Sequence, residues 1–171
     1  MTYQPREDSL FLKEWLEEQD LDGKKLLDMG TGSGILAVTS AKKGAEVTAV
    51  DVDPEALDDA RDHARQQEVH ERITFVESDL FEQVTGRFDI VVFNPPYLQG
   101  EEHLALEGGK SGVELTERFL EEVDDHLRDN GEAVFIASSR SDVEKLRQGF
   151  ELELLDDRKL WFETLYLFKS E

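Results

Sequence analysis

The sequence predicts an α/β fold: a mostly parallel sheet of seven strands, with helices on both faces and an antiparallel hairpin at the C-terminal end. Two observations lead to this class. Short apolar runs alternate with helix-like segments along the 171-residue chain, which is typical of repeated strand–helix–strand units. The last two runs are joined by a connection too short for a crossover helix, and only antiparallel strands can be joined so closely.

The first half has the order of elements of a Rossmann-like domain. A glycine-rich turn follows the first strand, and the next helix runs to Gly44, which we expect to cap its C-terminus. Asp53 and Pro54 open the following helix, because Asp is a good N-cap and Pro fits the first turn. Strands are expected at residues 24–29, 46–51, 73–76 and 88–93.

The second half is expected to complete the same single domain, residues 1–171. Apolar residues recur at helical spacing from Val113 to Leu127, and Asn130-Gly131 is expected to end that helix. The remaining elements are then a strand at 132–137, a short helix at 141–148, and a final strand pair at 150–155 and 161–168.

The chain is strongly acidic, with 40 Asp and Glu residues against 19 Lys and Arg and a net charge of −21. The acidic residues fall in nearly every expected helix and turn, which indicates a solvated surface over an ordinary core. Such a surface resembles that of proteins from salt-loving archaea, where high ionic strength screens the repulsion. A site for a basic partner is the alternative, and the even spread of charge disfavours it.

Composition also limits the kinds of site. The absence of cysteine excludes disulfides and zinc–thiolate sites, and the four histidines are scattered, so we expect no bound metal. Without an apolar stretch of transmembrane length or a signal-like N-terminus, the chain is expected to be cytoplasmic, with no membrane role. Trp15 and Trp161 lie in amphipathic or strand contexts, which favours packing roles over stacking platforms.

The most informative stretch is the strand at 88–93 with the residues that follow it, Asn94-Pro95-Pro96-Tyr97. A continuous apolar run is typical of a buried parallel strand, and two prolines end it because neither can donate to a ladder. The Asn94 side chain and the Pro95 carbonyl are then presented at the carboxyl end of the strand, where open α/β sheets bind ligands. Two acceptors beside the ring of Tyr97 suit a planar –NH2 group. A plain strand-ending turn is the alternative.

The glycine turn, Gly30-Thr31-Gly32-Ser33-Gly34, allows a ligand to approach the backbone at a helix N-terminus. Its G-x-G-x-G spacing differs from the G-x-G-x-x-G of nicotinamide-dinucleotide domains. Asp28 precedes the first glycine by two residues. A carboxylate has no use beside a pyrophosphate, but it can pair with an ammonium group.

Two more acidic residues lie at the ends of the next strands. Asp51 can hydrogen-bond a ribose diol, and Asp79 can accept from an adenine amino group. An ammonium, a ribose and an adenine together describe S-adenosylmethionine, so we expect this cofactor. Its expected contacts are Asp28, Gly30, Thr31, Gly32, Gly34, Asp51, Val52, Asp79, Leu80 and Asn94.

Asp28–Gly34 and Asn94–Tyr97 together resemble class I methyltransferases that modify planar nitrogens. Within that group, Tyr3–Ser9 resembles the N-terminal signature of the small HemK-type methyltransferases of archaea and eukaryotes, and residues 108–112 resemble a glycine-rich loop of that family. Members methylate the glutamine side chain in the Gly-Gly-Gln motif of translation release factors. The resemblance covers essentially the whole chain and implies a Rossmann-like class I methyltransferase fold. Because no helical domain precedes these motifs in the sequence, we expect the chain to fall outside the bacterial HemK branch.

The resemblance also implies roles for individual residues. Residues 1–20 would form an arm and helix over the cofactor, with Asp8 and Ser9 nearest to it. An ordinary helix start, with one of these two as N-cap, is the alternative. Asn94, Pro95 and Tyr97 would form the catalytic turn, and Pro96 would also contact the substrate. The Asn94 side-chain oxygen and the Pro95 carbonyl would accept hydrogen bonds from both N–H groups of the substrate amide. These two hydrogen bonds would favour the positive charge that forms on nitrogen.

Other functions stay open on the sequence. The same turn suits an exocyclic amine of adenine or guanine in RNA or DNA, with the base stacked on Tyr97, although the chain has no basic stripe for phosphate contacts. A cofactor-binding module without catalysis and an NAD-linked dehydrogenase are further alternatives. The intact Asn-Pro-Pro-Tyr turn disfavours the first of these, and the glycine spacing disfavours the second.

A partner is expected at one edge of the sheet. In a methyltransferase strand order the third strand, Ile73–Val76, lies at an open edge, and it lacks the proline and lysine residues that usually blunt edges. The resemblance implies a small zinc-binding activator subunit, which could add a strand there, helped by nearby Val69. A loop that covers this edge is the alternative.

Overall fold

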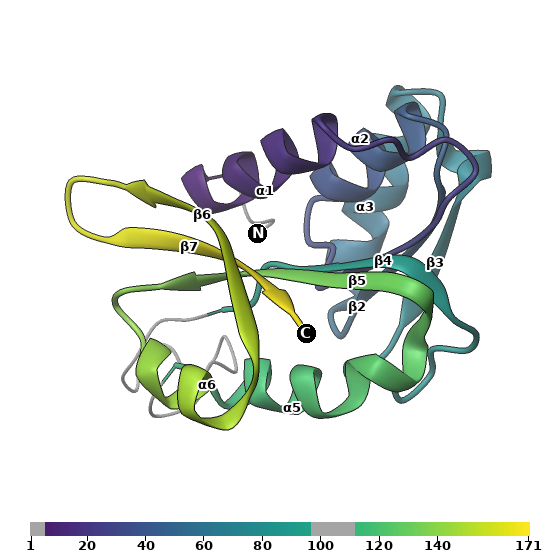
Figure 1. The fold of residues 1–171 in the computed structure, drawn as a ribbon. Helices are drawn as coiled ribbons and strands as arrows, with labels where there is room; N and C mark the ends of the chain where they lie inside the picture. The colour runs from purple at the N-terminus through teal and green to yellow at the C-terminus, as the bar shows by residue number, and fades with distance from the viewer. Residues whose placement is uncertain (1–5, 97–111) are drawn as a thin grey trace.

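The computed structural model describes residues 6–96 and 112–171. Its strands form one sheet in the order β3-β2-β1-β4-β5-β7-β6 (Figure 1). The pairs among the first five of these are parallel, and both pairs that involve the C-terminal strands are antiparallel. The predicted seven-stranded sheet with a closing hairpin is therefore confirmed. The strands are β1 (Lys25–Met29), β2 (Glu46–Asp51), β3 (Ile73–Glu77), β4 (Phe88–Phe93), β5 (Leu127–Ser138), β6 (Leu152–Lys159) and β7 (Thr164–Ser170).

Helices cover both faces of the sheet. The α-helices are α1 (Glu7–Glu17), α2 (Ile35–Lys42), α3 (Pro54–Gln66), α5 (Glu114–Glu122) and α6 (Val143–Gly149), with 3-10 turns η1 (His70–Arg72) and η2 (Val123–His126). Figure 1 shows α1, α2 and α3 over one face and α5 and α6 over the other. Successive strand residues point to opposite faces, so Leu26 belongs to the core cluster on one side and Leu27 to the cluster on the other.

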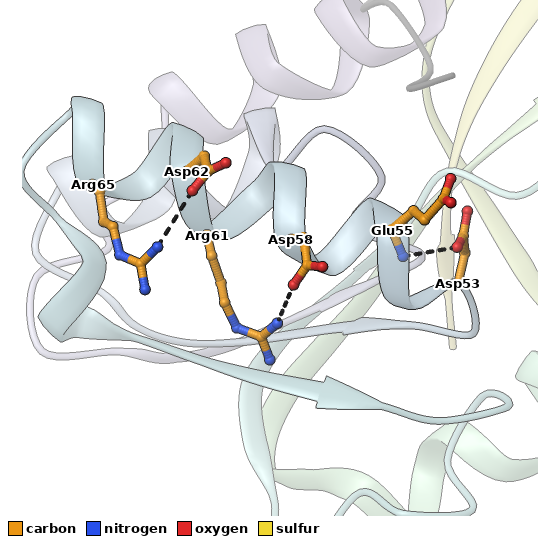
Figure 2. A network of polar contacts seen from close by, with 6 residues as sticks. All are labelled: Asp53, Glu55, Asp58, Arg61, Asp62 and Arg65. Atoms are coloured by element: carbon orange, nitrogen blue, oxygen red, sulfur yellow. Dashed lines mark hydrogen bonds and ion pairs between the residues drawn. The ribbon is translucent and has the colours of Figure 1, made fainter.

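The predicted helix boundaries around β2 are confirmed. Gly44 follows α2 with φ +93°, and its N–H donates to the carbonyl of Ala41. At the start of α3, the Asp53 carboxylate accepts the backbone N–H two residues further on, at 2.9 Å (Figure 2).

The outer face of α3 carries two ion pairs, Arg61–Asp58 at 3.0 Å and Arg65–Asp62 at 3.3 Å (Figure 2). All four side chains are well exposed to solvent. Pairs of this kind contribute only a few tenths of a kcal/mol, roughly. The acidic surface of this helix is thus solvated and is not held together by its ion pairs.

The prediction that Asn130-Gly131 ends a helix is wrong. The helical turns end at His126, and both residues lie inside β5. Phe88 pairs with Leu127 while Ile90 pairs with Glu132, so β5 carries a bulge here, with Asn130 at φ +64°. An Asn-Gly pair tolerates the left-handed conformation that such a bulge needs, and its sequence signal therefore fits either structure.

The packing role predicted for Trp161 is also wrong. β6 ends at Lys159 and β7 begins at Thr164, so Trp161 lies in the connection rather than in a strand. Its side chain is 98% exposed. Trp15, by contrast, is partly buried and packs against the core cluster beneath α1 and α2.

Within the described residues, no helix is both long enough and apolar enough to cross a bilayer.

Candidate functional site

The glycine turn and the Asn-Pro-Pro turn lie side by side because β1 and β4 are neighbours. Met29 pairs in register with Phe93, so Gly30 and Asn94 follow at the same level of the sheet. On the other side Met29 pairs with Val50, which brings the end of β2 to the same place. Parallel strands therefore carry the predicted site residues to one edge of the sheet, the usual ligand edge of open α/β folds.

The three glycines of the turn all have positive φ, between +54° and +81°. At Gly32 an added Cβ would meet no atom nearer than 4.0 Å, so this position is open. At Gly34 an added Cβ would lie 2.9 Å from the Cβ of Ala60, because α2 and α3 pack closely there. Gly32 therefore leaves room for a ligand, whereas Gly34 is needed for helix packing.

This difference predicts opposite outcomes for two alanine substitutions. Gly34→Ala is expected to lower the free energy of unfolding by about 2 kcal/mol or more, from backbone strain and overpacking together. Gly32→Ala is expected to cost only about 1 kcal/mol of stability. It is expected to weaken cofactor binding by at least about tenfold, because the added methyl group occupies the open space that the ligand needs. Urea unfolding and a binding titration of both variants check this. Equal stability losses, or unchanged binding in Gly32→Ala, would contradict the division of roles.

Asp28 is a buried carboxyl group, 1% exposed, in front of this turn. Thr31 donates its hydroxyl to Oδ2 at 2.8 Å. Oδ1 is buried and has no hydrogen-bond partner among the described residues. Burial raises the pKa of Asp28 to about 7, against the lowering effect of the Thr31 hydrogen bond. A buried acceptor without a partner suits a donor from outside the chain, and a cation best of all.

Asp51 holds the shape of the turn with its own carboxylate. One oxygen accepts the N–H of Gly32 at 2.9 Å, and the other accepts the N–H of Asp53 at 3.0 Å. Each carboxylate oxygen keeps a second acceptor position, so hydroxyl groups can still donate to it. Val52, the next residue, is 51% exposed and presents an apolar surface beside these acceptors.

Asp79 and Leu80 follow β3 but differ in environment. Asp79 is partly exposed and pairs with Arg118 of α5 at 3.3 Å, a contact that the sequence did not reveal. Leu80 is buried in the core and has φ +49°. Only the backbone of Leu80 is therefore available to a ligand, whereas Asp79 offers its side chain.

The Asn-Pro-Pro turn is connected to the first turn of α1. Asn94 donates its Nδ2 to the hydroxyl of Ser9 at 3.2 Å. The other amide atom, Oδ1, is buried and has no partner among the described residues. Pro95 is buried and Pro96 is half-buried, while Tyr97 lies outside the described residues. The hydrogen bond from Nδ2 thus orients the Asn94 amide, and its Oδ1 can still accept a hydrogen bond from a ligand.

The N-terminal arm is described only from Arg6, so residues 1–5 fall outside the structure, as do residues 108–111 of the predicted glycine-rich loop. Arg6 is the N-cap of α1, and the alternative that placed Asp8 or Ser9 there is wrong. Both residues are buried in the first turn. Because Ser9 contacts Asn94, the expected proximity of this arm to the site holds for the described part.

One residue that supports the turn was missed by sequence reasoning. His63 of α3 places its Nδ1 3.1 Å from the carbonyl of Ser33. The two residues are far apart along the chain, so no local pattern signals the contact. Among the described residues, no group of three or more His, Asp or Glu side chains is arranged to hold a metal ion.

A family model described as "Methyltransferase small domain" matches residues 7–154. The chain belongs to this methyltransferase family. A Methanocaldococcus jannaschii relative, named as a candidate protein N5-glutamine methyltransferase, is 37% identical over 182 residues, covering 98% of this chain and 90% of that protein.

Bacterial relatives match over a shorter part of their length. A Streptococcus pneumoniae release factor glutamine methyltransferase is 35% identical over 143 residues, covering 74% of this chain and 50% of the relative. A Francisella tularensis ribosomal protein uL3 glutamine methyltransferase is 31% identical, covering 68% and 42%. The chain thus spans about half the length of these two relatives.

Solved structures with the same fold include the Mtq2–Trm112 complex of E. cuniculi, described as responsible for methylation of the termination factor eRF1. Its matching chain has a TM-score of 0.77 at 27% identity, covering 99% of this chain and 98% of that one. A T. thermophilus 16S rRNA N2 G1207 methyltransferase, in complex with AdoMet and guanosine, has a TM-score of 0.79 at 24% identity over 98% of this chain and 43% of that one, which shows the fold alone.

This protein is an S-adenosylmethionine-dependent N-methyltransferase. The site fits that cofactor. The buried, unpartnered Oδ1 of Asp28 suits an ammonium group, and the open Gly32 backbone suits close approach of a ligand. The cofactor predicted from the residues is confirmed.

Proposed function

We propose that this methyltransferase methylates the glutamine side-chain amide in the Gly-Gly-Gln motif of a translation release factor. The observation that carries the proposal is the buried, unpartnered Oδ1 of Asn94, on an amide that Ser9 fixes from the other side. An acceptor in this position matches the N–H bond of a planar amide. The relatives named for release factors support the choice of substrate. Release factors act in the cytoplasm, where the proposal places the enzyme.

The chemistry requires help because an amide nitrogen is a poor nucleophile, its lone pair being delocalised into the carbonyl. Asn94 Oδ1 and the Pro95 carbonyl accept hydrogen bonds from the two N–H groups, and these hydrogen bonds strengthen as positive charge develops on nitrogen. Fixed dipoles of this kind stabilise the transition state more than the ground state. Tyr97 and Pro96 flank the planar group. When bound, S-adenosylmethionine supplies the methyl group from its sulfonium and leaves as a neutral thioether, and the methylated nitrogen releases one N–H proton to water. Alignment with the nitrogen provides the rest of the acceleration.

In this proposal, each cofactor-facing residue contacts a different part of S-adenosylmethionine. Asp28 pairs with the ammonium group, directly or through water, and Asp51 accepts from the ribose hydroxyls. Val52 covers a face of the adenine ring, and Asp79 accepts from its amino group, with the backbone of Leu80 beside it. The first turn of α1, with Asp8 and Ser9, closes over the methionine end, next to the catalytic turn.

An assay with methyl-labelled S-adenosylmethionine tests the proposal at the level of substrate class. Extract from cells that lack the enzyme serves as acceptor, in high-salt buffer suited to the acidic surface, and the product is digested separately with protease and nuclease. The proposal predicts protease-sensitive label in a band of release-factor size. Label in a protein of uL3 size would move the substrate to a ribosomal protein, and nuclease-sensitive label would favour the amino-base alternative.

The small partner subunit is proposed to bind at the edge of the sheet formed by β3. Among the described residues, β3 pairs with β2 only, and its residues Phe75 and Val76 are partly exposed, on opposite faces of the sheet at this edge. The Arg61 guanidinium lies 5.3 Å from the ring centre of Phe75 and shields part of it. Strand addition along such an edge is a common mode of recognition. The E. cuniculi neighbour was solved as a complex with a second protein, which supports a partner of this kind; that the partner binds zinc is part of the proposal.

Proline substitution tests this edge. Phe75→Pro removes a backbone donor and is expected to lower affinity for the activator subunit by at least about tenfold. The matched control is Asp157→Pro in β6, the edge strand on the opposite side of the sheet. Pull-down and calorimetry with both variants, after circular dichroism has confirmed folding, give the result. Equal affinity for both variants would contradict the assignment of the β3 edge.

A further inference from the structure

The connection between β6 and β7 carries an exposed aromatic pair. Trp161 is 98% exposed and its neighbour Phe162 is 60% exposed. Isolated exposed apolar residues are ordinary on protein surfaces, but tryptophan is highly buried on average. Two adjacent aromatic side chains in water indicate a surface that a partner covers, because tryptophan and arginine dominate the energetics of interfaces.

The pair lies beyond the same end of the sheet as Asn94, the end at which the parallel strands have their carboxyl termini. β7 runs antiparallel to β5, and Ser138, the last residue of β5, pairs with Leu165 near the start of β7. The connection therefore projects beyond the carboxyl end of β5, as the yellow hairpin at the left of Figure 1 shows. Phe93 is level with Phe135 and thereby with Phe168. From the strand spacing and the rise per residue, the tip lies about 20 Å from Asn94.

The tip is a fixed turn. The N–H of Leu160 donates to the carbonyl of Glu163 at 2.7 Å, which closes the turn around the aromatic pair. Ser138 donates its hydroxyl to the Glu163 carboxylate. The backbone N–H of Thr164 donates to the hydroxyl of Ser139 at 2.8 Å, which ties the hairpin to the end of β5. A preorganised turn loses little entropy when a partner binds.

The charge around the tip differs from that of the rest of the chain. Arg140 lies with its guanidinium 5.9 Å from the ring centre of Phe162, and Lys159 immediately precedes the turn. Both are exposed, and within residues 6–96 and 112–171 neither forms an ion pair. Cations beside exposed aromatic rings, in a chain of net charge −21, favour a partner surface with acidic and apolar groups.

We propose that this aromatic tip, formed by Trp161 and Phe162 with Arg140 and Lys159, is a docking element for the body of the protein substrate. The inference rests on the proposed function, in which a loop of a folded protein enters the site. A domain of about 100 residues has a radius of gyration of about 13 Å. Its surface therefore reaches the tip while its glutamine lies at Asn94. The tip contributes binding and specificity, and it takes no part in the chemistry.

The test compares a release factor with a short peptide that contains its Gly-Gly-Gln motif. In the double variant W161A/F162A, kcat/KM for the whole protein is expected to fall at least about tenfold, mainly through KM. Activity on the peptide and affinity for S-adenosylmethionine are expected to stay at the wild-type level. The matched control is Leu154→Ala, which removes an exposed apolar side chain from β6 and is expected to change neither activity.

Each result decides something. Equal losses on protein and peptide would overturn the docking role, because the tip would then act within the catalytic site. Unchanged activity on both substrates would also overturn it and would leave the proposed function intact. Failure of the wild-type enzyme to methylate either substrate would overturn the proposed function first. Wild-type binding to single-stranded RNA or to vesicles of phosphatidylcholine and phosphatidylserine, lost in the double variant, would assign the tip to that partner instead.

Discussion

Replacing Asn94 by alanine is expected to lower kcat about 100-fold or more. The magnitude follows from the loss of one fixed group that faces developing charge, as in an oxyanion hole. The variant removes the buried Oδ1 acceptor and leaves the glycine turn and Asp28 in place. Cofactor affinity is therefore expected to fall much less than turnover. Single-turnover kinetics, combined with a binding titration, separate the two effects.

The matched control for this variant is Ser9→Ala. It removes the hydroxyl oxygen that accepts the hydrogen bond from Asn94 Nδ2, 3.2 Å away, but keeps the Asn94 acceptor itself. Losing one neutral hydrogen bond costs about 1 kcal/mol, which corresponds to about fivefold in rate if it serves only to orient the amide. Near-native turnover in Asn94→Ala, with the cofactor bound, would refute the role of Asn94. A loss in Ser9→Ala as large as in Asn94→Ala would move the catalytic role to the α1 contact.

The second large effect concerns Asp28 and pH. Its pKa is raised from 3.8 to about 7 in the folded protein by burial. Between these values the folded state holds a proton that the unfolded chain has lost. Stability of the ligand-free protein therefore falls as pH rises from about 4 to about 7, by roughly 4 kcal/mol at most, and is level above that. Asp28→Asn removes this fall, so the variant is expected to be more stable than the wild type at pH 8.

Binding of S-adenosylmethionine has the opposite dependence on this group. An ammonium ligand favours the ionised carboxylate, so affinity is expected to weaken below pH 7, by up to tenfold per pH unit. An α-amino group loses its charge near pH 8, so affinity also declines on the alkaline side. In Asp28→Asn the acidic decline disappears and affinity at pH 7.5 is lower than in the wild type. An unchanged pH profile of affinity in the variant would refute the pairing.

The positions of the candidate site residues in the fold could be predicted because they depend on local patterns. Apolar runs end at Asp51 and Asn94, and glycines mark the turn after β1, the strand that lies between β2 and β4 in the sheet. Parallel strands necessarily bring their carboxyl ends together. The edge position of the third strand was expected from a family resemblance and not from periodicity. The sheet order, with β3 at one edge, confirms it.

The sequence predictions that the structure contradicts are wrong for physical reasons as well. The Asn130-Gly131 pair provides left-handed backbone in a bulge as readily as at a helix end, so its signal was ambiguous. The packing role predicted for Trp161 is wrong because a sequence pattern records apolar character and not exposure. Contacts such as Asn94 to Ser9, which join residues 85 positions apart, depend on tertiary packing and have no local signal. The buried acceptor atoms of Asp28 and Asn94 likewise appear only in three dimensions.

The decisive measurement is mass spectrometry of a purified release factor after incubation with this enzyme, S-adenosylmethionine and the candidate activator. Fragmentation of the Gly-Gly-Gln peptide is expected to show one added methyl group on the glutamine side chain, present with the wild-type enzyme and absent with Asn94→Ala. An unmodified glutamine, in a reaction where methyl transfer to RNA or to another protein proceeds, would contradict the proposed substrate.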